Sequence, residues 1–93
     1  MNETAFRLRA QEFEYGDIDY KDYPPQGDGP LHTHDFSVML LVVSGEFSIV
    51  GADKTTTYAP GEVCELAAQV PHAERAGARG ARVLLAKRPE RVS

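Results

Sequence analysis

The stretch formed by residues 31–50 constrains the fold more than any other part of the chain. It opens with two histidines one residue apart, His32 and His34, and continues into the apolar run 38–43. Alternate side chains of a β-strand lie on opposite faces, so both imidazoles are predicted on one face, which continues through apolar side chains. The run itself is apolar on both faces, which indicates a central, buried strand.

Short strands separated by turn residues are predicted for the rest of the chain. Each candidate strand is bounded by glycine, proline or small polar residues, as expected for a protein made of short strands. About eight such strands at regular spacing indicate an all-β sandwich or barrel with little or no helix. The expected strands are 5–15, a short strand within 16–23, 46–50, 55–58, 63–66 and 81–87; the expected turns and loops are 24–30, Ser44-Gly45, 51–54, 59–62, 67–71 and 74–80.

Length and composition limit the class of protein. A chain of 93 residues is expected to form one domain, 1–93, with a small core. The single cysteine, Cys64, rules out an internal disulfide framework and fits a reducing, cytoplasmic compartment. No apolar run approaches the roughly 20 residues that span a bilayer, and the first residues do not resemble a signal peptide. We therefore expect no membrane partner.

The charges are unevenly distributed along the chain. The formal net charge of −4 argues against nucleic-acid binding, which requires neutralisation of phosphates. Residues 12–35 hold seven acids and one base, whereas residues 75–93 hold six bases and one acid. The simpler interpretation is two solvated faces that attract each other; the alternative is a basic surface for an anionic partner.

All three histidines of the chain are candidates for one metal site. Imidazole is the commonest protein ligand for transition metals, and two imidazoles side by side in an apolar strand need a reason. His32 and His34 form the pair, and His72 follows Pro71 in a loop. Two alternatives stay open: histidines that are satisfied core residues, and a pocket that is vacant or filled by an anion.

The spacing of these residues resembles the cupin family. The His32-x-His34 pair, Gly45 eleven residues after His34, Gly61 in a Pro-Gly-Glu turn and the later His72 match positions of the two cupin motifs. The resemblance implies a small single-domain jelly-roll barrel of the RmlC type. It also implies that His32, His34 and His72 bind a divalent transition metal: zinc, iron, nickel or manganese.

One ligand position of the family is not matched. The glutamate of the first motif falls on Val38, which cannot bind a metal. Asp35 is a poor replacement, since it points away from the His34 face of a regular strand. The sequence leaves open which other carboxylate, if any, takes its place: Glu46, Glu62, Glu65 and Glu74 are the candidates.

Two functions are compatible with this sequence. The resemblance implies a metal-dependent enzyme that acts on a small molecule inside the barrel, by dioxygenase- or isomerase-type chemistry. The alternative is a non-enzymatic module that binds or senses a small molecule at a degenerate metal site. A homodimer is predicted through an edge strand, either 6–10 or 81–85, because an unpaired edge is costly. Cys64 is predicted to be an inert core residue or, alternatively, to line the pocket; Phe36, Met39, Leu40, Phe47 and Tyr58 are the other candidates for its walls.

Overall fold

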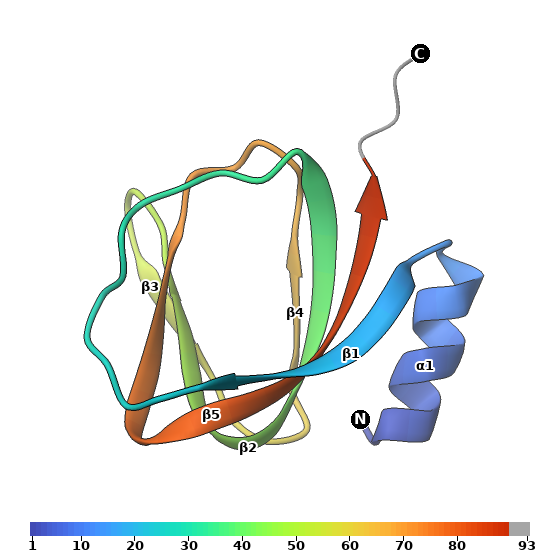
Figure 1. Cartoon of the computed structure of the whole chain (residues 1–93), viewed down its shortest axis with the longest axis horizontal. Helices are drawn as coiled ribbons and strands as arrows, with labels where there is room; N and C mark the ends of the chain where they lie inside the picture. Colours follow the sequence, from blue (N-terminus) through green and yellow to red (C-terminus); the bar gives the residue numbers. More distant parts are fainter. Residues whose placement is uncertain (90–93) are drawn as a thin grey trace.

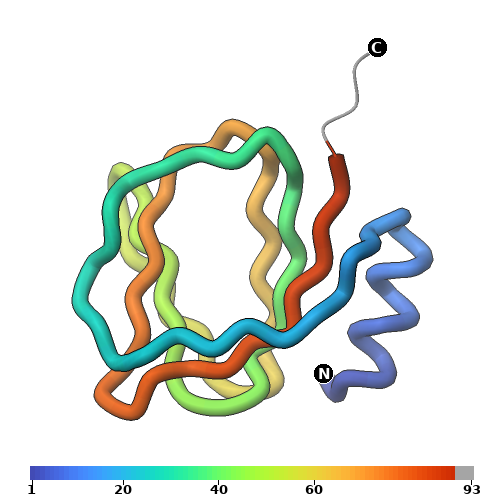
Figure 2. Tube along the Cα trace, viewed as in Figure 1, coloured from blue at the N-terminus to red at the C-terminus, as the bar shows by residue number. Residues whose placement is uncertain are grey.

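The computed structural model describes residues 1–89 and consists of one antiparallel sheet and one helix. The sheet has the strand order β1-β5-β2-β3, and β4 pairs with β2 beside this path. Figures 1 and 2 show the strands curving round into a ring, with the helix outside it. The elements are α1 (Glu3–Glu12), β1 (Gly16–Tyr23), β2 (Phe36–Val50), β3 (Thr55–Tyr58), β4 (Val63–Leu66) and β5 (Ala73–Pro89).

Two long bent strands, β2 and β5, hold the sheet together. The first half of β2 pairs with β4 on one side and with the end of β5 on the other. Its second half pairs with β3 and with the beginning of β5. The sheet therefore folds over on itself, and the all-β jelly roll that the sequence predicted is confirmed.

The bend lies where glycines from the two strands meet. Gly45 and Gly80 both have positive φ, and a Cβ on Gly45 would overlap the carbonyl oxygen of Gly80. The predicted turn at Ser44-Gly45 and the predicted loop 74–80 are wrong, because both segments lie inside continuous strands. Glycine here permits a sharp bend and a close backbone approach without interrupting the strand pairing.

The main core lies between the two halves of the folded sheet. Its largest side chains are Phe47 and Leu40, which are almost fully buried. Cys64 belongs to this cluster, so its prediction as a buried core residue is confirmed. The other buried members are Val38, Val42, Ile49, Ala76, Ala81 and Val83.

The predicted strand 5–15 is wrong: most of it belongs to helix α1. Asn2 caps this helix, since its side chain accepts a hydrogen bond of 2.8 Å from the backbone N–H of Ala5. Phe6 and Ala10 are buried, whereas Leu8 is 63% exposed. Burial at i and i+4 but not at i+2 is the period of a helix, and the residues of α1 are mostly good helix formers. The expectation of little or no helix therefore needs this one correction.

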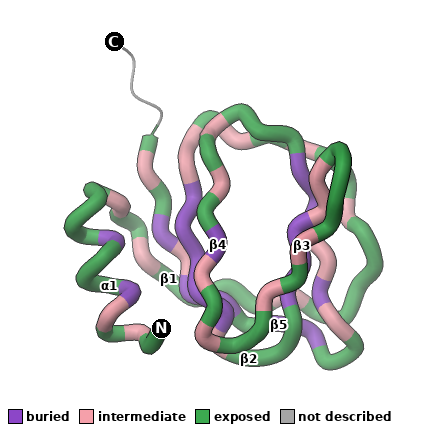
Figure 3. The backbone as a smooth tube through the Cα atoms, turned by 180° about the vertical axis from the view of Figure 1, so that it is seen from behind, coloured by how far each residue is buried: buried purple, intermediate pink, exposed green. Residues whose placement is uncertain are grey.

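Helix α1 covers the outer face of the sheet and forms a second core. Phe6 and Ala10 pack against Met39 and Leu41 of β2, together with Leu84 and Ala86 of β5. Figure 3 shows that the buried positions of α1 lie on the side facing the sheet. Successive residues of β2 thus serve two cores, which explains why this strand is apolar on both faces.

Neither segment proposed as a dimer edge is an unpaired strand. Residues 6–10 are helical, and residues 81–85 pair with both β1 and β2. The homodimer itself stays a prediction.

Opposite charges from the two unevenly charged segments do pair. Arg75 contacts Asp28, and Nε of Arg82 lies 3.9 Å from Asp22. This supports the interpretation of mutually attracting faces; the last four residues of the basic segment, 90–93, lie outside the described part. No helix of residues 1–89 is long and apolar enough to cross a membrane.

Candidate metal centre

A backbone bridge joins the two segments that carry the histidines. The N–H of His32 donates to the carbonyl of His72 at 2.9 Å, and the N–H of His72 donates to the carbonyl of His32 at 3.0 Å. The two residues are therefore directly opposite each other in an antiparallel pair, where side chains project to the same face. Their ring centroids lie 4.6 Å apart.

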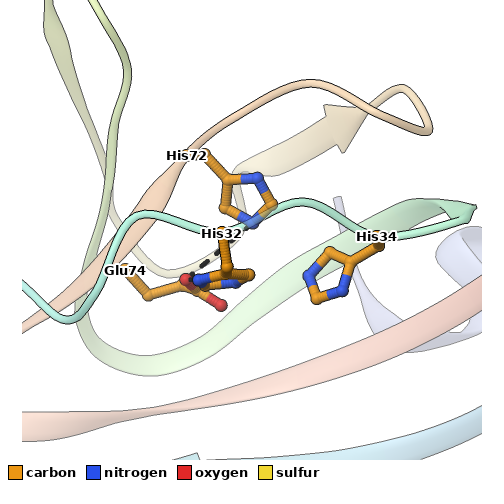
Figure 4. A group of neighbouring side chains, drawn as sticks. All are labelled: His32, His34, His72 and Glu74. Carbon is orange, nitrogen blue, oxygen red and sulfur yellow. Dashed lines mark ion pairs between the residues drawn. The ribbon is translucent and has the colours of Figure 1, made fainter.

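Both of these imidazoles are oriented by backbone carbonyls. Nδ1 of His32 lies 2.8 Å from the carbonyl oxygen of Pro30, and Nδ1 of His72 lies 3.0 Å from that of Val70. A carbonyl can only accept, so each Nδ1 carries a proton, and Nε2 is the ring nitrogen of each residue that can bind a metal. Figure 4 shows both rings directed toward Glu74. Oε2 of Glu74 lies 3.1 Å from Nε2 of His32 and 3.8 Å from Nε2 of His72.

His34 completes the group from the other side. It lies two residues before the start of β2, and its ring stacks on Phe36 at 4.7 Å between centroids. Its centroid lies 4.9 Å from that of His32 and 5.1 Å from that of His72. Burial and the neighbouring imidazoles of His72 and His32 lower the pKa of His34. The ring is therefore neutral at neutral pH, which is the form that binds a metal.

Glu74 is the carboxylate that the sequence left undetermined. It follows His72 by two residues at the start of β5, so the two side chains share one face of the strand. Among the candidates of residues 1–89, only Glu74 joins the three histidines in one group. The His72-x-Glu74 spacing repeats the His32-x-His34 spacing. This repeat was the feature of the sequence that could have identified Glu74 as the fourth ligand.

The four side chains fit a metal ion. One ligand atom from each of His32, His34, His72 and Glu74 lies within 4.8 Å of all the others. Nitrogen and oxygen ligands bind zinc at about 2.0–2.2 Å in tetrahedral geometry, so two ligands of one ion lie about 3.3–3.6 Å apart. The separations of 3.1 Å and 3.8 Å between Oε2 of Glu74 and the two Nε2 atoms are already near this value, and the widest pair has to close by roughly 1 Å to hold an ion.

The group lies beside a cavity of about 470 Å³ inside the barrel. Val38, at the unmatched glutamate position, is part of the cavity wall. Of the predicted wall residues, Phe36, Leu40 and Phe47 line the cavity, whereas Met39 packs against α1. Cys64 and Tyr58 are not among its lining residues. The other lining residues are Asp17, Asp19, Tyr20, Lys21, Tyr23, His34, Ile49, Leu66, His72, Glu74, Leu85 and Lys87.

Comparison with sequence families gives one match. The family described as Cupin domain matches residues 20–86 of this chain, which include all four residues of the group. No curated protein matches the chain.

Solved structures resemble the chain in fold. A structure of unknown function from Rhizobium leguminosarum bv. viciae 3841 has a TM-score of 0.72 at 23% identity, over 78% of this chain and 69% of that one. An RmlC-like cupin from Shewanella frigidimarina NCIMB 400 has a TM-score of 0.66 at 20% identity, over 80% and 66%. The iron(II) form of HppE has a TM-score of 0.66 at 19% identity, over 75% of this chain but only 41% of that protein. At these identities the likeness concerns the fold.

Proposed function

The chain belongs to the cupin family, and on that premise we propose that it binds a divalent transition metal through His32, His34, His72 and Glu74. We propose that the metal coordinates a small organic molecule that enters the barrel cavity. The observation that carries this proposal is the convergence of three imidazoles and one carboxylate at the wall of a cavity. Three imidazoles with a carboxylate suit zinc, iron, nickel or manganese.

Neighbouring groups of the protein orient the three imidazole ligands. The carbonyls of Pro30 and Val70 accept from Nδ1–H of two ligands, which directs Nε2 of each ring into the site. Stacking on Phe36 orients the third ring. When bound, the metal supplies Lewis-acid or redox chemistry to a coordinated small molecule.

Glu74 also bears on the choice between an enzyme and a binding module. The degenerate site was suggested by Val38, because a valine replaces the ligand carboxylate of the family. A carboxylate from β5 supplies the same donor from another position, which supports an intact site and favours a metal-dependent enzyme of dioxygenase or isomerase type. The non-enzymatic module is the alternative, and the iron(II) in the HppE structure is a reason to test iron first.

Elemental analysis of the purified protein tests the metal site. We expect about one metal ion per chain in the parent, and its loss in His34→Ala and His72→Ala. Glu65→Gln is the matched control, because Glu65 is an exposed carboxylate of β4 outside the group. Circular dichroism identifies any variant that fails to fold, and His32→Ala then replaces it, since the His32 side chain is one third exposed.

The outcomes separate the alternatives. A parent that holds no metal and takes up none on reconstitution contradicts the metal site. If iron is bound, oxygen consumption with candidate small molecules distinguishes an oxygenase from a binding module.

A further inference from the structure

Strand β1 gives the cavity one polar wall. Its alternate residues Asp19, Lys21 and Tyr23 all line the cavity, as expected for one face of a strand. Strand β2 contributes only apolar side chains to the lining, among them Leu40 and Phe47. The cavity lining therefore has an apolar part and a charged part. A molecule that fills the cavity needs an apolar body and a charged or polar group.

Two lysines of the cavity lining, Lys21 of β1 and Lys87 of β5, lie over aromatic rings. Nζ of Lys21 lies 4.9 Å from the ring centroid of Tyr23, and Nζ of Lys87 lies 5.0 Å from that of Phe36. Within residues 1–89, neither ammonium group forms an ion pair with a carboxylate. Cation–π contact fixes the position of each charge but leaves its hydrogen-bond donors available to a ligand.

Both lysines are close to the proposed metal ligands. Phe36 separates Lys87 from His34, because the His34 ring stacks on Phe36. Lys21 and Lys87 line the same cavity as His34. A molecule bound near the metal can therefore reach either ammonium group.

Tyr23 adds a neutral hydrogen-bond donor beside Lys21. Its ring packs against Phe47 at 5.0 Å between centroids, and the residue is half-buried. Burial and the negative charge of Glu74 raise the pKa of Tyr23 to about 12. The phenol is therefore protonated at neutral pH and can donate to an oxygen atom.

The charges of the lining indicate how much negative charge a ligand carries. Asp17 and Asp19 also line the cavity and offset the two lysines. One oxygen of Asp19 accepts the backbone N–H of Tyr20 at 2.8 Å, so part of this carboxylate already has a partner. A divalent ion with Glu74 leaves one positive charge, which a single negative charge on the ligand neutralises.

We propose that the cavity takes a small monocarboxylate with an apolar body, whose carboxylate is bound by Lys21 and Lys87 with Tyr23 as an additional donor. The apolar body packs on Val38 and Leu40 of β2. The monocarboxylate is the class of ligand for the proposed metal site, so this inference rests on the proposed function. A carboxylate beside two ammonium groups forms charge-assisted hydrogen bonds, which are stronger than neutral ones.

Calorimetric titration with benzoate and benzamide tests the proposal, since the two probes differ in charge but little in shape. Parent, Lys21→Met, Lys87→Met and the double variant are compared with Lys54→Met, a control in the exposed loop before β3. Each protein is titrated in zinc-loaded and in metal-free form, with zinc content measured in the same samples. We expect each cavity substitution to weaken benzoate binding about fivefold. Benzamide binding should not change, and Lys54→Met should behave like the parent.

The outcomes keep the two proposals apart. The monocarboxylate proposal is overturned if the double variant prefers benzoate over benzamide as strongly as the parent does. It is also overturned if benzoate does not bind to the parent at millimolar concentration. If the parent takes up none of zinc, iron, nickel and manganese, the metal site is wrong. The titrations of the metal-free protein then still show whether the two lysines contribute to benzoate affinity.

Discussion

His32 and His72 form an antiparallel backbone bridge, each donating its N–H to the carbonyl of the other. The bridge places the imidazoles of two distant segments 4.6 Å apart. It also fixes the register that brings Glu74, two residues after His72, against Nε2 of His32. The geometry of the site therefore depends on strand pairing as much as on the ligand side chains.

Removal of the Glu74 carboxylate should weaken metal binding without unfolding the barrel. Glu74→Gln keeps the shape but removes the anionic ligand, and we expect zinc or iron affinity to fall by tenfold or more. Glu65→Gln should retain the affinity of the parent. Competition with a chromogenic chelator measures both. Equal affinities for the parent and Glu74→Gln would mean that the three histidines alone hold the ion.

Metal retention should depend on pH. Imidazole binds a metal only in its neutral form, and its ordinary pKa is about 6.5. Protons therefore compete with the metal for the imidazole ligands, and because the pKa of His34 is lowered, affinity should fall only once the pH is below about 6.5. Dialysis at a series of pH values followed by elemental analysis measures the loss. Full retention at pH 5 would show that carboxylates dominate the coordination.

The sequence predicted those parts of the fold that local signals determine. Strands 55–58 and 63–66 and the turn 59–62 between them match the structure, because threonine-rich and Pro-Gly segments specify them locally. The segments around Gly45 and Gly80 were predicted as a turn and a loop, although both lie within strands, because glycine ordinarily marks a turn. Only the pairing of β2 with β5 shows that both strands continue through the bend.

The site was predictable in part for the same reason. Three histidines were enough to propose a metal centre, and the structure brings His32, His34 and His72 together. The fourth member required knowledge of which distant segments pair. Before the bridge between His32 and His72 is known, four glutamates are equal candidates; once it is known, Glu74 is the one on the correct face.

Cys64 should be unreactive in the folded protein. It is 2% exposed, and burial raises the pKa of its thiol. Because only the thiolate attacks disulfides, the protonated form predominates at pH 8 and reaction with Ellman's reagent should be slow. The rate should increase as the pH rises toward the raised pKa, and it should become fast in guanidinium chloride. Rapid reaction of the folded protein at pH 8 would place the thiol at the surface.

Stability should distinguish the two faces of α1. Phe6 is fully buried against β2 and β5, so Phe6→Ala should lower the free energy of unfolding by about 3–5 kcal/mol. Leu8 is largely exposed, so Leu8→Ala should change it by no more than about 0.5 kcal/mol. Urea denaturation followed by circular dichroism measures both. Similar losses for the two variants would fit the strand that the sequence first indicated.

The close contact between Gly45 and Gly80 gives the sharpest test of the bent-strand architecture. Gly45 has a φ of 80°, and a Cβ there would overlap the backbone of Gly80. Left-handed backbone alone costs an L-residue about 1–2 kcal/mol, and the overlap adds to this cost. Gly45→Ala should therefore lose more than about 3 kcal/mol of stability or fail to fold.

Gly27→Ala is the matched control for this substitution. Gly27 lies in the loop before β2, where an added Cβ meets no atom within 4 Å and φ is not positive. Alanine restricts the unfolded chain more than glycine does, so this variant should be as stable as the parent or slightly more stable. Thermal unfolding of both variants compares them. If Gly45→Ala were as stable as Gly27→Ala, β2 and β5 could not approach each other at this bend.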